Sequence, residues 1–128
     1  MGRRQTFKIP GVSHTRAPIP MAARVGPILQ TSAIMGKDPA TSDLPGDPVR
    51  EVEFCFLNAK AILDAAGLTP DDVVYMDVFL KDGSLREAVN QFWCAWYPSA
   101  DDRPARHTTI QDIPFGMNIQ LKFQAVFP

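Results

Sequence analysis

Residues 118–125, near the end of the chain, alternate strictly between apolar and polar side chains. A period of two is typical of a β-strand that buries one face and exposes the other. The apolar positions are Ile119, Leu121, Phe123 and Ala125, and the polar positions are Asn118, Gln120, Lys122 and Gln124. This stretch therefore predicts a sheet with one buried face and one polar face.

Two amphipathic helices are predicted to cover the buried face of that sheet. The first extends from Asp47, an N-cap followed by Pro48, to Gly67, a C-terminal stop. Its apolar residues recur at spacings of three and four: Val49, Val52, Phe56, Ala59, Leu63 and Ala66. The second begins near Ser84, where Glu87 completes a capping box, and Pro98 ends it. Its predicted inner face consists of Leu85, Val89, Phe92 and Trp96.

The remaining strands follow from β-rich runs between turn signals. They are predicted at residues 6–9, 24–35 (a strand pair or one bent strand), 73–80, 107–111 and 117–127, with a loop over 36–48. The order β-β-α-β-α-β-β predicts an α+β fold, with two helices on one face of a single mixed sheet. At 128 residues, one domain over 1–128 is expected. The uncovered face is expected to pack against copies of the chain, with clefts between subunits.

Composition argues against several kinds of partner. The net charge is −1 and the basic residues are scattered, which argues against nucleic acid. No segment approaches the roughly 20 apolar residues of a membrane span, and the first residues do not resemble a secretory signal, so a cytoplasmic protein is expected. Cys55 and Cys94 are expected to be small apolar fillers of the helices. His14 has no companion at metal-ligand spacing, so no metal site is expected.

Residues 103–106 read Arg-Pro-Ala-Arg and precede a β-branched run. Pro104 favours an extended conformation for Arg103, and the run places Arg106 at the start of a strand. Because side chains alternate along an extended segment, the two arginines are expected to point to opposite faces. The planar guanidinium of Arg106 suits a two-pronged grip on a carboxylate. The alternative is a solvated or ion-paired surface side chain, which is the role expected of Arg103.

Several segments, taken together, resemble a known family. They are residues 30–33 (Gln-Thr-Ser-Ala), 38–41 (Asp-Pro-Ala-Thr), 58–67 (Asn-Ala-Lys-Ala-Ile-Leu-Asp-Ala-Ala-Gly), 78–82 (Val-Phe-Leu-Lys-Asp), 89–90 (Val-Asn), 103–106, 113–114 (Ile-Pro) and the last strand. In this order they resemble the reactive-intermediate deaminase (Rid) family, also called YjgF or L-PSP endoribonuclease-like, from about residue 14 onward. The resemblance implies a chorismate-mutase-like fold and a homotrimer with sites at subunit interfaces. It also implies hydrolysis of imines or enamines to an oxo acid and ammonia, with no metal and no organic cofactor.

The resemblance also assigns candidate site residues. It implies that Arg106 grips the carboxylate of a small substrate and that Asn90 lies close to the site. Three positions depart from the family pattern: Ile19 replaces a tyrosine of the pocket wall, Thr108 replaces a cysteine, and Gln120 replaces a glutamate that helps to bind the attacking water. An amide can hold a water molecule but cannot accept its proton.

These departures leave alternatives open. Ser32 is expected either to donate a hydrogen bond to a ligand or to satisfy backbone groups at a strand end. The apolar Ile19 favours a longer unsaturated substrate, such as a 2-aminomuconate-type enamine. The amide of Gln120 is also compatible with a non-catalytic module that binds small carboxylates. Ribonuclease activity, a label that the family sometimes carries, is disfavoured by the charge distribution.

Overall fold

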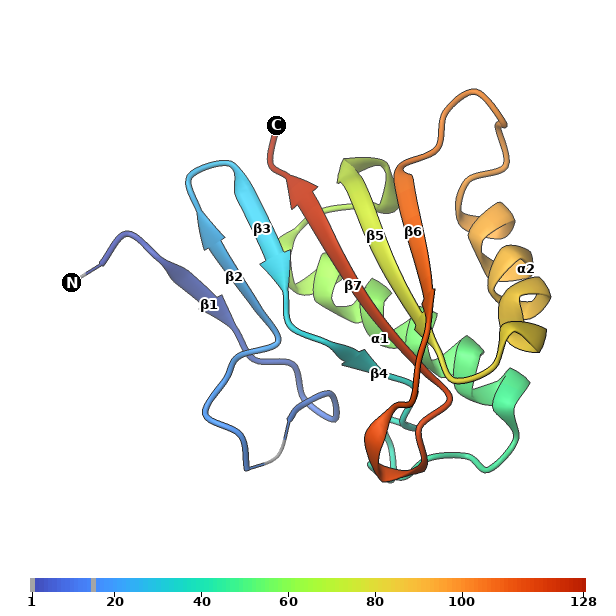
Figure 1. Ribbon diagram of the computed structural model, residues 1–128. Helices are drawn as coiled ribbons and strands as arrows, with labels where there is room; N and C mark the ends of the chain where they lie inside the picture. The colour runs from blue at the N-terminus through green and yellow to red at the C-terminus, as the bar shows by residue number, and fades with distance from the viewer. Residues whose placement is uncertain (1, 15) are drawn as a thin grey trace.

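The computed structural model describes residues 2–14 and 16–128 (Figure 1). Within this part of the chain, one seven-stranded sheet has the order β1-β2-β3-β7-β5-β6, with β4 paired to β7. The strands are β1 (Gln5–Phe7), β2 (Ala22–Val25), β3 (Ile28–Thr31), β4 (Ile34–Met35), β5 (Val73–Leu80), β6 (Ala105–Ile110) and β7 (Ile119–Val126). The β5–β6 pair is parallel and the other pairs are antiparallel, so the sheet is mixed, as predicted.

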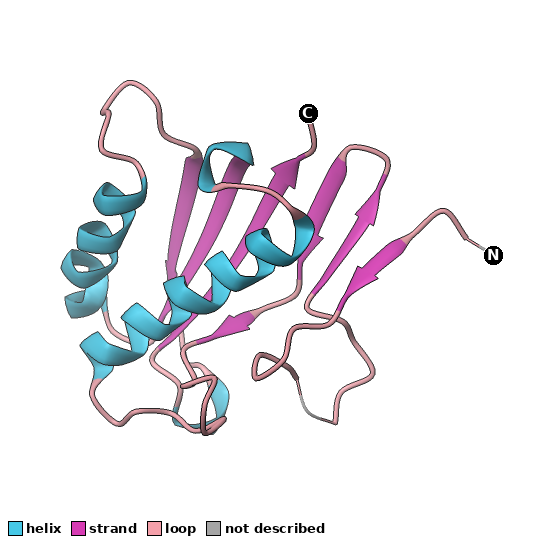
Figure 2. Cartoon of the chain, turned by 180° about the vertical axis from the view of Figure 1, so that it is seen from behind, coloured by secondary structure: helices cyan, strands magenta, loops and turns pink. Residues whose placement is uncertain are grey.

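Two helices, α1 (Pro48–Ala66) and α2 (Arg86–Trp96), lie on the same side of the sheet (Figure 2). Helix α1 crosses the middle of the sheet, whereas α2 lies beside the edge strand β6. Short 3-10 turns precede β5, α2 and β7; they are η1 (Pro70–Asp72), η2 (Gly83–Leu85) and η3 (Pro114–Gly116). The predicted fold class, two helices on one face of a single mixed sheet, is confirmed. In the described ranges, no helix has the length and apolar character needed to cross a membrane.

The core lies between the sheet and the helices. Paired residues of β5 and β7 that face the helices are almost completely buried: Met76 with Phe123, Val78 with Leu121, and Leu80 with Ile119. The pairs on the opposite face, which we call the open face, are Tyr75 with Gln124, Asp77 with Lys122, and Phe79 with Gln120. All six of these residues are partly exposed. The alternation predicted for the last strand is therefore confirmed.

Helix α1 begins and ends where its sequence signals predict. The Asp47 carboxylate accepts a hydrogen bond from the Val49 backbone N–H at 3.1 Å, and Pro48 occupies the first helical position. Gly67 ends the helix at φ 73°, a left-handed conformation that costs glycine little. The predicted inner face is wrong at Val49, which is 48% exposed although Glu51 and Val52 in the same turn are buried.

The helical segment begins near Ser84, as predicted, but the capping box predicted there is wrong. The Asp82 carboxylate, not Ser84, accepts the capping bond: it receives the Ser84 N–H at 2.9 Å and initiates η2. Helix α2 then starts at Arg86 with no side-chain cap. Its buried side consists of Val89 and Trp93, and the partly buried rings of Phe92 and Trp96 pack on Phe56 of α1. Cys94 is exposed, so its expected role as a buried filler is also wrong, whereas Cys55 is buried as predicted.

The segment predicted as strand over residues 24–35 divides into β2, β3 and β4. Gly26, at φ 59°, allows the tight turn between β2 and β3. The strand predicted over residues 6–9 is β1 at the edge of the sheet.

A buried carboxylate fixes the start of β7. Glu51 of α1 is 1% exposed, and it accepts hydrogen bonds from the backbone N–H of Asn118 at 2.7 Å and from its side-chain Nδ2 at 2.9 Å. Gly36 packs against the Glu51 backbone, where an added Cβ would lie 2.2 Å from the carbonyl oxygen. This contact network positions Gln120, two residues further along β7.

Candidate functional site

Arg106 lies on β6 and points toward α2. In the parallel register its partner is Met76, which faces the helices, so Arg106 projects from the same face of the sheet. Its Nη2 donates to the Oδ1 of Asn90 at 2.7 Å. The guanidinium carbon lies 4.9 Å from the centre of the Trp93 ring, within the range of a cation–π contact. The structure therefore brings Arg106 and Asn90 together, on a platform formed by an aromatic ring.

The positive charge of Arg106 has no acidic partner within 4 Å among residues 2–14 and 16–128. Burial lowers the pKa of the Arg106 guanidinium, and the nearby positive charge of Arg86 lowers it further. An arginine nevertheless stays charged in proteins, because its ordinary pKa lies far above neutral pH. The buried Nη1 has no hydrogen-bond partner in the described part of the chain. A half-buried, uncompensated cation of this kind favours binding of an anion.

Alternation predicts that the Arg103 side chain points to the face opposite Arg106, and this prediction is wrong. The Nε of Arg103 donates to the Tyr97 carbonyl oxygen at 2.9 Å, and its Nη2 lies 3.6 Å from the Cys94 Sγ, so it also contacts the end of α2. The reason is that β6 begins only at Ala105, and alternation holds only within a strand. The contact to Tyr97 gives Arg103 a structural role, through a carbonyl group and not through an ion pair.

Gln120 lies on the open face, where its neighbours across the sheet are Met35 of β4 and Phe79 of β5. Its Nε2 is 3.8 Å from the Sδ of Met117, a weak acceptor. It lines a cavity of about 530 Å³ whose wall is mostly apolar and also includes two cationic residues. Members of that wall are Met35, Leu44, Pro114, Met117, Arg16 and Lys37. The cavity offers an amide beside an apolar surface.

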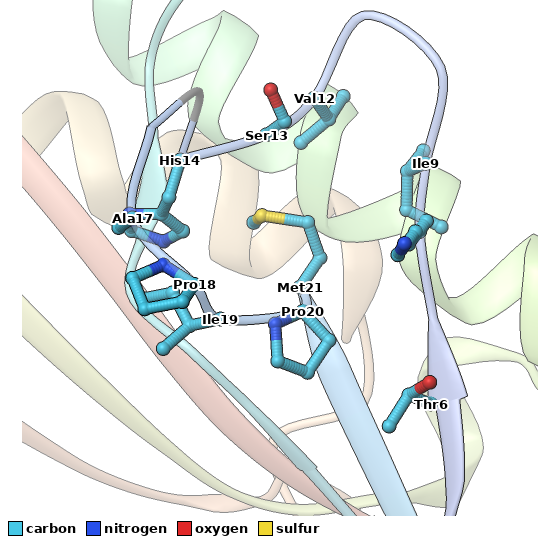
Figure 3. A pocket seen from close by; sticks show the side chains of 11 residues that line it. Thr6, Ile9, Val12, Ser13, His14, Ala17, Pro18, Ile19, Pro20 and Met21 are labelled. Carbon is cyan, nitrogen blue, oxygen red and sulfur yellow. The ribbon is translucent and has the colours of Figure 1, made fainter.

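Ile19 and Ser32 lie in and beside the loop that follows β1. Ile19 is 48% exposed and lines a second cavity of about 520 Å³, together with His14, Pro18 and Met21 (Figure 3). The Ser32 hydroxyl donates to the Pro20 carbonyl oxygen at 2.7 Å, so it ties this loop to the end of β3. Of the two roles left open for Ser32, the contact made in the chain is the backbone one.

The candidate residues thus fall into separate groups within one chain. Arg106 and Thr108, two positions apart on β6, share the face that lies beside Asn90. Gln120 belongs to β7, on the opposite face, and β5 lies between the two strands. Neither of the two cavities described above is lined by Arg106. A site that uses both Arg106 and Gln120 must therefore take them from different copies of the chain.

Sequence reasoning did not assign Arg86 or Trp93 to the site. Arg86 and Asn90 are four residues apart on α2, a spacing that places them on one side of a helix. Trp93 follows Asn90 by three residues, so it lies on that side too. The i, i+4 spacing from Arg86 to Asn90 and the i, i+3 spacing from Asn90 to Trp93 are the signals that could have pointed to these residues. In the described ranges, no group of three His, Cys, Asp or Glu side chains is arranged to hold a metal ion.

Comparison with known sequences identifies the family. Residues 14–127 match the family described as endoribonuclease L-PSP. The chain belongs to the endoribonuclease L-PSP family. This membership confirms the resemblance to Rid and YjgF proteins inferred from the sequence segments.

Individual relatives and a solved structure show how close the likeness is. The 2-iminobutanoate/2-iminopropanoate deaminase of Escherichia coli K12 is 30% identical over 104 residues, which cover 80% of this chain and 81% of that protein. A RutC family protein of Haemophilus influenzae is 38% identical over 73 residues, covering 57% of this chain and only 56% of that protein's length. The crystal structure of Escherichia coli TdcF with bound serine has a TM-score of 0.87 at 21% identity, covering 97% of this chain and 99% of that chain. The TdcF comparison shows a shared fold.

Proposed function

We propose that this protein is a hydrolytic deaminase of reactive imines or enamines that carry a carboxylate, and that it releases an oxo acid and ammonia. Arg106 anchors the substrate carboxylate, with Asn90 beside it. The observation that carries the proposal is the half-buried guanidinium of Arg106, which has no acidic partner within 4 Å in the described chain and an unpaired buried Nη1. A relative named as an imine deaminase supports the same chemistry.

The reaction depends more on the orientation of the substrate and the attacking water than on strong acids or bases. A protonated imine carbon is already electrophilic, water adds to it, and the amine then leaves as ammonia while the carbonyl group forms. The attacking water loses two protons in all. The first moves to the nitrogen, which can then leave as ammonia, and the second, released when the hydroxyl becomes a carbonyl group, converts that ammonia to ammonium, so no net proton has to be stored on the protein. Gln120 can hold the water by hydrogen bonds, and the proton passes through water or the substrate itself. The rate gain comes from holding the substrate carboxylate in place while the water is positioned against the imine carbon.

The active unit we propose is a homotrimer of single domains spanning residues 1–128. Arg106 and Gln120 project from opposite faces of the sheet, so a second copy has to bring Gln120 toward Arg106. Exposed apolar residues near the open face, among them the 89% exposed Phe115, would be covered in such an assembly. We place the protein in the cytoplasm, where thiols such as those of Cys55 and Cys94 stay reduced.

We further propose that the substrate is longer than the short 2-imino acids. Ile19, exposed in the loop cavity, and the apolar wall around Gln120 both favour an extended hydrocarbon portion. A 2-aminomuconate-type enamine has that character. Thr108, on the same face of β6 as Arg106, would line the entrance beside the carboxylate.

A second candidate function is a non-catalytic module that binds small carboxylates. The observation in its favour is Gln120, because an amide cannot act as a general base where a glutamate could. Under this alternative Arg106 binds the same ligand and no bond is broken.

Ammonia release from freshly generated imino acids tests the proposal. The wild type should accelerate hydrolysis above the buffer rate, and Arg106→Ala should lower kcat/KM by about 100-fold, the loss of a bidentate charged contact. Arg50→Ala is the matched control, because Arg50 is an exposed arginine on α1 paired with Glu53. If wild-type rates equal the buffer rate while calorimetry detects binding of 2-oxo acids, the non-catalytic alternative holds instead.

A further inference from the structure

We propose that Arg86 makes this site select substrates with two acidic groups, so that Arg106 and Asn90 hold the carboxylate next to the imine carbon and Arg86 binds the second one. The proposal rests on the carboxylate grip of Arg106 described above. It adds a binding partner for the second carboxylate of a dicarboxylate imine or enamine, a group that a 2-aminomuconate-type substrate also carries.

The positions of three residues carry the inference. Arg86 is the first residue of α2, and Asn90 follows four residues later on the same side of the helix. The Oδ1 of Asn90 accepts the hydrogen bond from Arg106 at 2.7 Å. Arg86 therefore lies one helical turn before the amide that Arg106 contacts. The charge of Arg86 is close enough to contribute to the lowered pKa of Arg106, after the larger effect of burial.

The charge at this place is not balanced within the chain. Neither Arg86 nor Arg106 forms an ion pair within 4 Å with any acidic side chain of residues 2–14 and 16–128. Asp82, one helical turn before Arg86, already uses its carboxylate to accept the Ser84 N–H. Two neighbouring cations repel each other, and a ligand with one negative charge neutralises only one of them. A ligand with two carboxylates neutralises both.

The location of Arg86 is also unfavourable for folding. The N-terminal end of a helix carries a partial positive charge, so a cation in the first turn is destabilising. Helix α2 has no side-chain cap, and Glu87 is the acidic residue that its first turn contains. Arg86 thus opposes helix formation, repels Arg106 and has no ion-pair partner in the described chain. We expect such a side chain where the residue is selected for binding and not for stability. Replacing Arg86 by an uncharged residue should therefore raise the melting temperature while weakening dicarboxylate binding.

Two matched substrates test the inference on the full-length protein. Glutamate oxidase converts glutamate to 2-iminoglutarate, and an amino-acid oxidase converts norvaline to 2-iminopentanoate, which has five carbons and one carboxylate. We expect a kcat/KM at least about tenfold higher for 2-iminoglutarate. Arg86→Gln should abolish that preference through KM, leave 2-iminopentanoate within about twofold, and raise Tm. Arg106→Gln should impair both substrates.

Binding titrations keep this inference separable from catalysis. Calorimetry with 2-oxoglutarate and 2-oxopentanoate should show the same Arg86-dependent preference, whether or not imines are turned over. The matched comparison is Lys37→Met, which removes a cation from the Gln120 cavity instead. The inference is overturned if the preference is lost in Lys37→Met but not in Arg86→Gln. It is also overturned if the wild type binds both oxo acids with equal affinity. Arg106-dependent turnover of 2-iminopentanoate would in that case leave the proposed function standing.

Discussion

Replacing Glu51 tests whether one buried carboxylate holds the strand that carries Gln120. Its two oxygens accept the Asn118 backbone N–H at 2.7 Å and Asn118 Nδ2 at 2.9 Å, and the Ile119 N–H is 3.4 Å away. In Glu51→Ala these donors lose their acceptor, and an unsatisfied buried donor costs about 1–3 kcal/mol. Because the vacated space admits water, we expect the free energy of unfolding to fall by about 3 kcal/mol.

Glu51→Gln separates the hydrogen bonds from the charge. A glutamine oxygen accepts the Asn118 backbone N–H, and the Asn118 amide can turn so that its oxygen accepts from the new Nε2. We therefore expect a loss of only about 1 kcal/mol. Urea unfolding followed by tryptophan fluorescence should place the Glu51→Ala midpoint about 1–2 M below the wild type, with an unchanged slope. The reasoning is refuted if Glu51→Gln is as damaging as Glu51→Ala, or if Glu51→Ala changes stability by less than about 1 kcal/mol.

Three further predictions concern a thiol, a catalytic group and a turn. Cys94 should react with a thiol reagent in the native protein, and Cys55 should react only after unfolding. The reason is that burial, and to a smaller extent the charge of Glu51, raise the pKa of the Cys55 thiol. Labelling of both cysteines at equal rates would contradict this. Gln120→Glu should raise the ammonia-release rate by about 10²-fold by supplying a general base, and no gain would argue against water held at that position. Gly67→Ala should lower the free energy of unfolding by about 1 kcal/mol in the same urea assay, because φ is 73° there, and an unchanged midpoint would exclude the strain.

The parts of the fold that follow local rules were predictable from the sequence. Asp47, Pro48 and Gly67 define both ends of α1 because capping and left-handed termination act within one helical turn. The alternation in β7 identifies its two faces because a strand has a period of two. Where two local signals compete, the sequence does not decide: Asp82 and Ser84 both suit a helix cap, and the side chain that forms the bond is Asp82.

The candidate site was predictable only in part, because it depends on tertiary order. Arg106 was found from the residues around it, but its contact with Asn90 depends on where α2 lies beside β6. The separation of Arg106 from Gln120 arises because β5 is inserted between β6 and β7, although β6 and β7 are consecutive in the sequence. The direction predicted for the Arg103 side chain was wrong because pairing with β5, and not local sequence, sets the residue at which β6 begins.

A crystal structure of the protein with 2-oxobutanoate bound is the most direct test of the central claim. The account predicts the ligand carboxylate within about 3 Å of the Arg106 guanidinium, with Asn90 beside it and Gln120 of a neighbouring copy facing the carbonyl carbon. A carboxylate bound elsewhere, with Arg106 still paired only to Asn90, would contradict it.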